Sequence, residues 1–276
     1  MSYFDQHVHS YHSFDSSTPP EDNVHRALEI GLGGVTFTEH FDTHPDDWRS
    51  CTYKEEVYTA AIEDLRKRYG SQLFIGKGIE VCYQPERMDF ILNYLAEHPF
   101  DLVILSIHYF RGQAVHGREH WEGITVEEGT RCYLENVLDA ARFCERLHRQ
   151  RGRVFDVLGH LDLAKRYTQR FFDRYNIDEH EDLIDEILQA CLAADLVPEI
   201  NTSTLRQNLH EPMPGQRTIS RYAQLGGQAV PLGSDAHLPQ SVGAGFDQAV
   251  SMLRKAGIRH TVLFRNRDRS VVPLSD

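Results

Sequence analysis

The sequence has no long apolar run. No stretch of its 276 residues approaches the roughly 18 consecutive apolar residues that a transmembrane helix requires. The first residues, MSYFDQHVHS, also lack the basic and then apolar pattern of a secretory leader. We therefore expect neither a membrane span nor an exported protein.

Cysteine is scarce and scattered. The five cysteines form no C-x-x-C pair, and their number is odd; they are Cys51, Cys82, Cys132, Cys144 and Cys191. This usage excludes a disulfide framework and a structural zinc ribbon, and it predicts a reducing, cytoplasmic location.

Basic charge is also in short supply. Twenty-nine Lys and Arg stand against 41 Asp and Glu, which gives a net charge of −12 and disfavours a nucleic-acid partner. Bound divalent cations would offset part of this deficit. The apolar fraction of 41% is ordinary for a globular protein, and the length suits one domain over residues 1–276. The unusual feature is the presence of 16 histidines.

The chain reads as an alternation of short β-rich runs and amphipathic helices. Seven units in 276 residues give about 39 residues each, which favours a closed parallel α/β barrel of TIM type. A doubly wound sheet is the alternative, but the first strand is not followed by the glycine turn that cradles phosphate in such folds. A C-terminal segment, Thr261–Arg265 and Val271–Pro273, predicts a last strand or a closing flap. The candidate strands are Tyr3–His9, Gly34–Thr38, Leu73–Glu80, Leu102–His108, Val154–Leu158, Val197–Asn201 and Ala229–Gly233.

Metal-binding residue types gather where these strands end. In a parallel barrel all such ends open on one face, where active sites lie. The residues are His7 and His9, which share a face because strands have a period of two, then His40, Glu80, His108, His160, Asp235 and His237, with Asp15 on the first loop. Nine N/O ligands are too many for one ion, so two or three metals follow, with Glu80 as the natural bridge. Clustered divalent ions of this kind suit hydrolysis.

Other catalytic patterns are missing. The sequence has no G-x-S-x-G elbow, so serine hydrolysis is unsupported. The stretch GSQLFIGK at residues 70–77 has five residues between its glycines and no following Ser or Thr, so it does not match a phosphate-binding loop.

Seven segments together resemble the polymerase-and-histidinol-phosphatase (PHP) superfamily, and within it the histidinol-phosphate phosphatase branch. They cover about residues 4–250 in the family's order. The segments are FDQHVHSYHSFDS (4–16), TFTEHFD (36–42), GIEVCY (78–83), FDLVILSIHYFRG (100–112), FDVLGHLDLAKRY (155–167), EINTSTLRQ (199–207) and LGSDAH (232–237).

The resemblance implies a distorted seven-stranded (β/α)7 TIM-like barrel with a trinuclear centre of Zn, Mn or Fe. The first metal would be held by His7, His9, Glu80 and Asp235, the second by Glu80, His108 and His160, and the third by Asp15, His40 and His237. Some family members have histidine at the position of Asp15. A hydroxide bridging the first two ions would attack phosphorus. Glu80 and Asp235 would thus act in catalysis, and His237 is our candidate for a general acid.

The resemblance also implies basic residues that grip the phosphate, because guanidinium offers paired donors of fixed geometry. These are Arg206, Arg166 and, as a neighbouring competitor, Lys165. The acidic residues expected near a cationic leaving group are Asp162, Glu119 and Glu122. Two further candidates for substrate contact lie in the long loop after the fourth strand, His116 and His120.

The expected function is hydrolysis of L-histidinol phosphate in histidine biosynthesis, acting on a small phosphate monoester without a nucleic-acid or membrane partner. The alternative is a PHP phosphoesterase for nucleotides or short oligonucleotides, which should carry a basic or aromatic groove. An amidohydrolase normally has a bridging modified lysine after the fourth strand, where this chain has His108. A non-catalytic metal-binding protein would not need a complete ligand set with phosphate-binding arginines.

Overall fold

The computed structural model describes residues 3–45, 53–110, 112–207 and 209–274. Within them, eight strands form a parallel sheet in the order β8-β7-β4-β3-β2-β1-β11-β9. Their bounds are β1 Phe4–Val8, β2 Gly34–Phe41, β3 Phe74–Cys82, β4 Leu102–Ser106, β7 Val157–Leu158, β8 Val197–Pro198, β9 Ile200–Asn201 and β11 Leu232–Gly233.

The two outer strands of this order, β8 and β9, belong to one run of chain that only Glu199 interrupts. One half of the run pairs with β7 and the other half pairs with β11, so the sheet closes on itself. Counting the run once gives seven strand segments around a barrel. The predicted distorted seven-stranded barrel is therefore confirmed, and the distortion lies at the break around Glu199.

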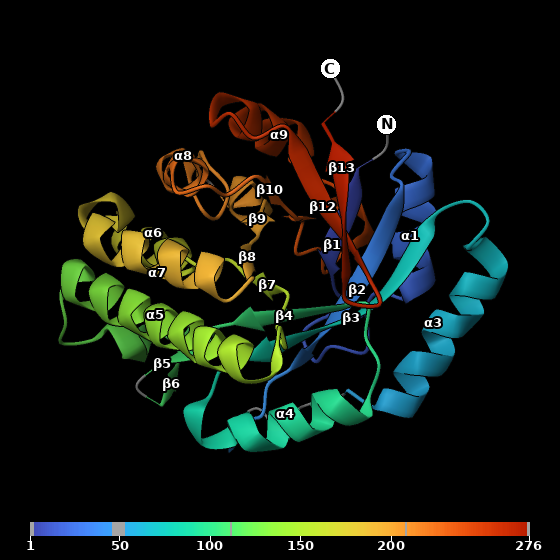
Figure 1. Ribbon diagram of the computed structural model, residues 1–276, viewed down its shortest axis with the longest axis horizontal. Helices are drawn as coiled ribbons and strands as arrows, with labels where there is room; N and C mark the ends of the chain where they lie inside the picture. Colours follow the sequence, from blue (N-terminus) through green and yellow to red (C-terminus); the bar gives the residue numbers. More distant parts are fainter. Residues whose placement is uncertain (1–2, 46–52, 111, 208, 275–276) are drawn as a thin grey trace.

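Helices surround the strands (Figure 1). They are α1 Pro20–Glu29, α3 Glu55–Tyr69, α4 Met88–Glu97, α5 Val126–Arg151, α6 Ala164–Phe172, α7 Glu181–Ala193, α8 Gln216–Gln224 and α9 Phe246–Lys255. One face of α5 is apolar and buried, and Leu134 and Val137 on it are both fully inaccessible. Burying such a side chain contributes about 1.5–3 kcal/mol. Among the described residues, no helix is both long and apolar enough to cross a membrane.

The ends of the helices follow the sequence signals. Pro20 opens α1 with two acidic residues in the first turn, and Gly31 follows its end with φ at +73°. Thr125 caps α5 by accepting a hydrogen bond from the Glu128 amide, and the Glu128 carboxylate accepts one from the Thr125 amide in return. Short 3-10 helices complete the connections at Pro85–Arg87, Arg118–Trp121, Ile177–Glu179, Ser203–Arg206 and Pro239–Ser241.

The C-terminal segment is a closing flap. It forms an antiparallel hairpin of β12 His260–Arg265 and β13 Asp268–Pro273, joined by β10 Ala229–Val230 in a separate sheet. Gln6, which is buried on β1, donates to Val262 O at 2.5 Å and accepts from Phe264 N at 2.9 Å. Asn266 N donates to Asp101, just before β4 begins, at 2.9 Å. The hairpin thus covers the end of the barrel where strands start. A second small hairpin, β5 Tyr109–Phe110 with β6 Gln113–Ala114, follows β4.

Candidate metal centre

The nine predicted metal ligands meet at the other end of the barrel, where the strands finish. A cavity of about 490 Å³ opens there. Seven of the nine are among its lining residues: Asp15, His40, Glu80, His108, His160, Asp235 and His237. The other two, His7 and His9, are fully buried beside them. The structure therefore brings all nine together, although they come from segments as far apart as residues 7 and 237.

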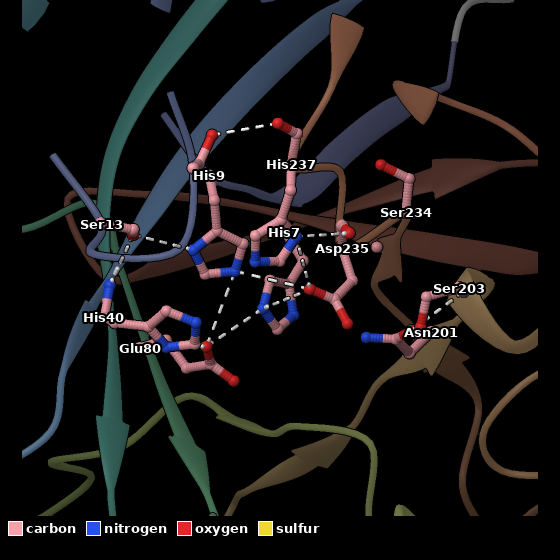
Figure 2. A network of polar contacts seen from close by, with 12 residues as sticks. His7, His9, Ser13, His40, Glu80, Asn201, Ser203, Ser234, Asp235 and His237 are labelled. Carbon is pink, nitrogen blue, oxygen red and sulfur yellow. Dashed lines mark hydrogen bonds and ion pairs between the residues drawn. The ribbon is translucent and has the colours of Figure 1, made fainter. Parts of the chain in front are cut away.

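Glu80 stands at the middle of this group. It lies on β3 directly opposite His40 on β2, which continues three residues past its expected end. Its Oε2 atom is 3.4 Å from His7 Nε2, 3.6 Å from His9 Nε2 and 2.9 Å from His40 Nδ1. Figure 2 shows these three imidazoles and the carboxylate directed toward one another.

The other oxygen of Glu80 faces a second group of imidazoles. Oε1 lies 3.2 Å from His108 Nε2 and 2.9 Å from His160 Nε2, and it accepts a hydrogen bond from Ser106 Oγ at 2.6 Å. Because its two oxygens face different sets of donors, this carboxylate has the geometry of a bridge between two cations.

Asp235 and Asp15 complete the group on the side of His237. Asp235 Oδ1 is 3.5 Å from His9 Nε2 and 3.6 Å from His237 Nδ1. The backbone of Asp235 has φ at +54°, a region that non-glycine residues rarely adopt and that is found preferentially at functional sites. Asp15 Oδ2 lies 2.9 Å from His237 Nε2 and 3.4 Å from His40 Nε2.

The donor atoms fit divalent ions. His7 Nε2, His9 Nε2 and Glu80 Oε2 are buried, yet they have no hydrogen-bond partner among the described residues. Orphaned buried polar atoms are costly and call for an explanation. With metal–ligand distances of about 2.0 Å, tetrahedral ligands lie about 3.3 Å from one another, close to the 3.4 and 3.6 Å that separate these nitrogens from Glu80 Oε2.

The charges of the side chains around the cavity lead to the same conclusion. Burial opposes ionisation, but the neighbouring imidazoles hold the pKa of Glu80 and that of Asp235 well below their usual range. Burial likewise opposes protonation of His7, but Glu199 and Glu80 raise its pKa well above the ordinary value. The pKa of His9 falls to about 3 through burial and the adjacent His237 and other imidazoles. Ionised carboxylates thus face imidazolium protons, whose place cations would take.

A sequence model of the PHP domain matches residues 5–203. The chain belongs to the PHP domain family.

Relatives of this PHP protein include a histidinol-phosphatase from Lactococcus lactis, 28% identical over 266 residues that cover 96% of this chain and 95% of that protein. A histidinol-phosphatase from Bacillus subtilis is 25% identical over 268 residues, 88% of this chain and 96% of that one. Among solved structures, the histidinol phosphate phosphatase of Lactococcus lactis, in complex with zinc, L-histidinol and phosphate, superposes with a TM-score of 0.84. It is 25% identical and covers 98% of this chain and 99% of its own.

Three carboxylates that we did not predict from the sequence contact the candidate ligand histidines of this PHP barrel on their Nδ1 side, two directly and one through a serine. Asp42 lies 3.0 Å from His108 Nδ1, and Glu199 lies 2.7 Å from His7 Nδ1. His9 Nδ1 is 3.1 Å from Ser13 Oγ, which in turn donates to a buried glutamate, Glu39, at 2.6 Å. The position of Asp42 near the centre could have been predicted, because it shares a strand face with His40 at a spacing of two. Glu199 carried no comparable signal.

The two arginines predicted to bind phosphate differ in position. Arg166 is among the residues that line the cavity, and its Nη2 donates to Asp235 Oδ2 at 3.1 Å and to Ser203 Oγ. Arg206 is absent from the described lining; its Nη2 donates to Ser234 O at 2.7 Å and Asp235 O at 3.3 Å. Arg206 therefore holds the backbone that carries Asp235.

Lys165 is turned away from the cavity. The side chain is fully buried, and its Nζ donates to Pro212 O at 2.7 Å and Glu211 at 3.2 Å, and pairs with Asp162 at 2.8 Å. With its donors engaged in this internal network, the position of Lys165 does not support a direct phosphate contact. The same pairing removes Asp162 from the candidates for binding a substrate amine.

The outer wall of the cavity is partly aromatic. Besides the metal-ligand candidates, the described lining residues are Phe14, Asp42, Tyr109, Val115, His116, Leu163, Arg166, Tyr167 and Arg170. Neither Glu119 nor Glu122, both exposed, is among them. The side chain of His120 lies outside the described part of the chain. Among the described residues, the carboxylates that line the cavity are therefore those of the candidate metal ligands and Asp42.

Proposed function

We propose that this PHP protein hydrolyses L-histidinol phosphate to L-histidinol and phosphate at a centre of three divalent ions, as a step of histidine biosynthesis. The observation that carries the proposal is the convergence on Glu80 of five imidazoles from four segments of the chain, with buried nitrogen and oxygen atoms that lack a hydrogen-bond partner directed inward. Its support from relatives is that histidinol-phosphatases align over nearly their whole length with this chain.

The proposed ligand sets are those expected from the sequence. His7, His9, Glu80 and Asp235 would hold one ion, Glu80, His108 and His160 the second, and Asp15, His40 and His237 the third. Bound ions would acidify a water molecule and neutralise the phosphate charge, which no side chain here can do alone. Zinc is our first candidate because the Lactococcus lactis structure contains it, and the same N/O donors suit manganese and iron.

The side chains have separate tasks in this proposal. Arg166, on the cavity wall beside Asp235, would grip the phosphate through paired guanidinium donors. Arg206 is the second proposed phosphate contact, and it also fixes the Asp235 backbone. The two roles considered for His237 compete, because a ring bound through Nε2 keeps its proton on Nδ1, which donates it to Asp235 O at 3.1 Å and is not free to protonate a leaving group. We therefore assign His237 to metal binding, and the leaving alcohol would take its proton from water.

The rival substrate class is a nucleotide. A nuclease would need a positively charged groove that follows several phosphates. Arg166 and Arg170 are the only Lys or Arg residues in the described lining of this cavity, so its aromatic wall is not matched by a basic track. We therefore propose a small-molecule partner and no nucleic acid. A single domain over residues 1–276 and a cytoplasmic location are part of the same proposal; the four cysteines that the structure describes are all free.

A panel of phosphate esters tests this function. Metal-reconstituted protein should hydrolyse L-histidinol phosphate with a kcat/KM at least about 10²-fold above that for p-nitrophenyl phosphate or a nucleoside monophosphate, or about 2.7 kcal/mol. The phosphate is common to all three, so the difference must come from binding of the alcohol portion. A nucleoside monophosphate that matched or exceeded L-histidinol phosphate would replace the proposal with the nucleotide phosphoesterase.

A further inference from the structure

Glu199 occupies the break at which the barrel closes. It separates β8 from β9, is 1% exposed, and uses its two oxygens in different directions. Oε1 lies 2.7 Å from His7 Nδ1. Oε2 accepts from the backbone amide of His160 at 3.1 Å and from Asn201 Nδ2 at 3.3 Å. The Glu199 carboxylate is closely packed against β11, because a Cβ atom added to Gly233 would lie 2.0 Å from Oε1.

This contact decides which nitrogen of His7 can bind a metal. A carboxylate accepts hydrogen bonds, so His7 Nδ1 carries a proton toward Glu199, and Nε2 keeps its lone pair for the centre. Nε2 is indeed the atom that faces Glu80 Oε2 at 3.4 Å. We propose that Glu199 is a positioning residue that fixes the metal-binding tautomer of His7 and ties it to the segment carrying His160. The inference rests on the proposed metal centre, but not on the identity of the substrate.

Replacement of Glu199 by glutamine should therefore weaken metal binding by changing the tautomer of His7, in addition to removing a negative charge. Two donors, from His160 and Asn201, face Oε2, so the amide oxygen of glutamine must occupy that position. Its NH2 group then faces His7 Nδ1, which has to become the acceptor. The ring proton moves to Nε2, and that nitrogen can no longer bind a cation.

A matched control exists at the neighbouring histidine. The two oxygens of Asp42 lie 3.2 and 3.0 Å from His108 Nδ1, so an asparagine there can turn its carbonyl oxygen to the ring and preserve the tautomer. Asp42→Asn and Glu199→Gln thus each remove one negative charge from a carboxylate that contacts a histidine Nδ1. The first preserves the metal-binding tautomer of its histidine, and the second reverses it.

The test uses Zn²⁺ alone. Metal-free wild type, Glu199→Gln and Asp42→Asn are titrated against a chromophoric zinc chelator, after thermal unfolding has shown that each variant folds. Losing the partner of a metal-bound histidine typically costs about 10–100-fold in metal affinity. We expect about 100-fold for Glu199→Gln at one site and about 10-fold or less for Asp42→Asn. Equal losses in the two folded variants would overturn the inference, whereas a wild type that bound no zinc would overturn the proposed function as well.

If Glu199→Gln fails to fold, the tautomer of His7 can be measured directly in the wild-type protein by NMR. In zinc-loaded protein labelled with ¹⁵N-histidine, the His7 signals can be assigned by their loss in His7→Gln. Nδ1 should carry a slowly exchanging proton and Nε2 should show the shift of a metal-bound nitrogen. An unprotonated Nδ1 would refute the positioning role of Glu199.

Discussion

Replacing Glu80 by glutamine keeps the size of the side chain and removes the negative charge shared by two groups of imidazoles. Its Oε2 lies 3.4 Å from His7 Nε2, and its Oε1 lies 3.2 Å from His108 Nε2. Two unit charges about 3.4 Å apart attract by about 5 kcal/mol at an effective dielectric constant of 20. The remaining ligands would recover part of this energy when cations are present. We expect a net loss of at least about 2.7 kcal/mol, or 10²-fold in kcat.

The Glu80→Gln variant should also lose one equivalent of metal, because a neutral amide holds two cations less well than a carboxylate. Metal content by mass spectrometry and kcat for L-histidinol phosphate are measured on the same preparation. Glu97→Gln, at an exposed position on α4, makes the same chemical change away from the cavity and should alter neither quantity. Full metal content with near-normal turnover in Glu80→Gln would show that Glu80 is not the bridge.

Three further predictions follow from the side chains around the centre. Arg166→Ala should lower kcat/KM for all phosphate monoesters by a similar factor, about 10²-fold, because it contacts the shared group; a change in the ratio between esters would refute this. Lys165→Ala should cost about 3–5 kcal/mol in the free energy of unfolding, measured by denaturant titration, because it leaves Asp162 buried and unpaired; a loss below about 1 kcal/mol would contradict the buried network. Metal affinity should fall as the pH is lowered, because carboxylates hold the pKa of His7, His40 and His108 above the ordinary value despite burial, and cations must displace those protons. A chelator competition that gave the same affinity at pH 6 and pH 8 would contradict that balance.

The sequence was sufficient to predict that the nine candidate ligands converge, because strand periodicity and strand ends are local properties. A period of two placed His7 and His9 on one face, and the parallel barrel then brought the ends of the other strands to the same opening. The way in which the barrel closes was harder to predict from the sequence. It depends on a single run, residues 197–201, that changes its pairing partner at Glu199.

The environment of individual side chains could not be predicted in the same way. Lys165 and Arg166 are neighbours in sequence, but adjacent residues on a helix point about 100° apart. Only Arg166 reaches the cavity, while Lys165 enters the interior beside Asp162. The pair formed by Glu199 and His7 joins residues 192 positions apart, and only the three-dimensional structure reveals it. The positions of Asp162, Glu119 and Glu122, which were considered for the substrate amine, likewise depend on tertiary packing: Asp162 pairs with Lys165, and the two glutamates are not among the described lining residues.

Anomalous diffraction from zinc-loaded crystals would show whether the nine side chains hold three ions with Glu80 as the bridge, as we propose. We expect three zinc peaks inside the cavity, two of them about 3.5–4 Å apart with one oxygen of Glu80 directed to each. The third peak should lie among Asp15, His40 and His237. A single peak, or zinc held without Glu80, would show that the centre is not a Glu80-bridged site for three ions.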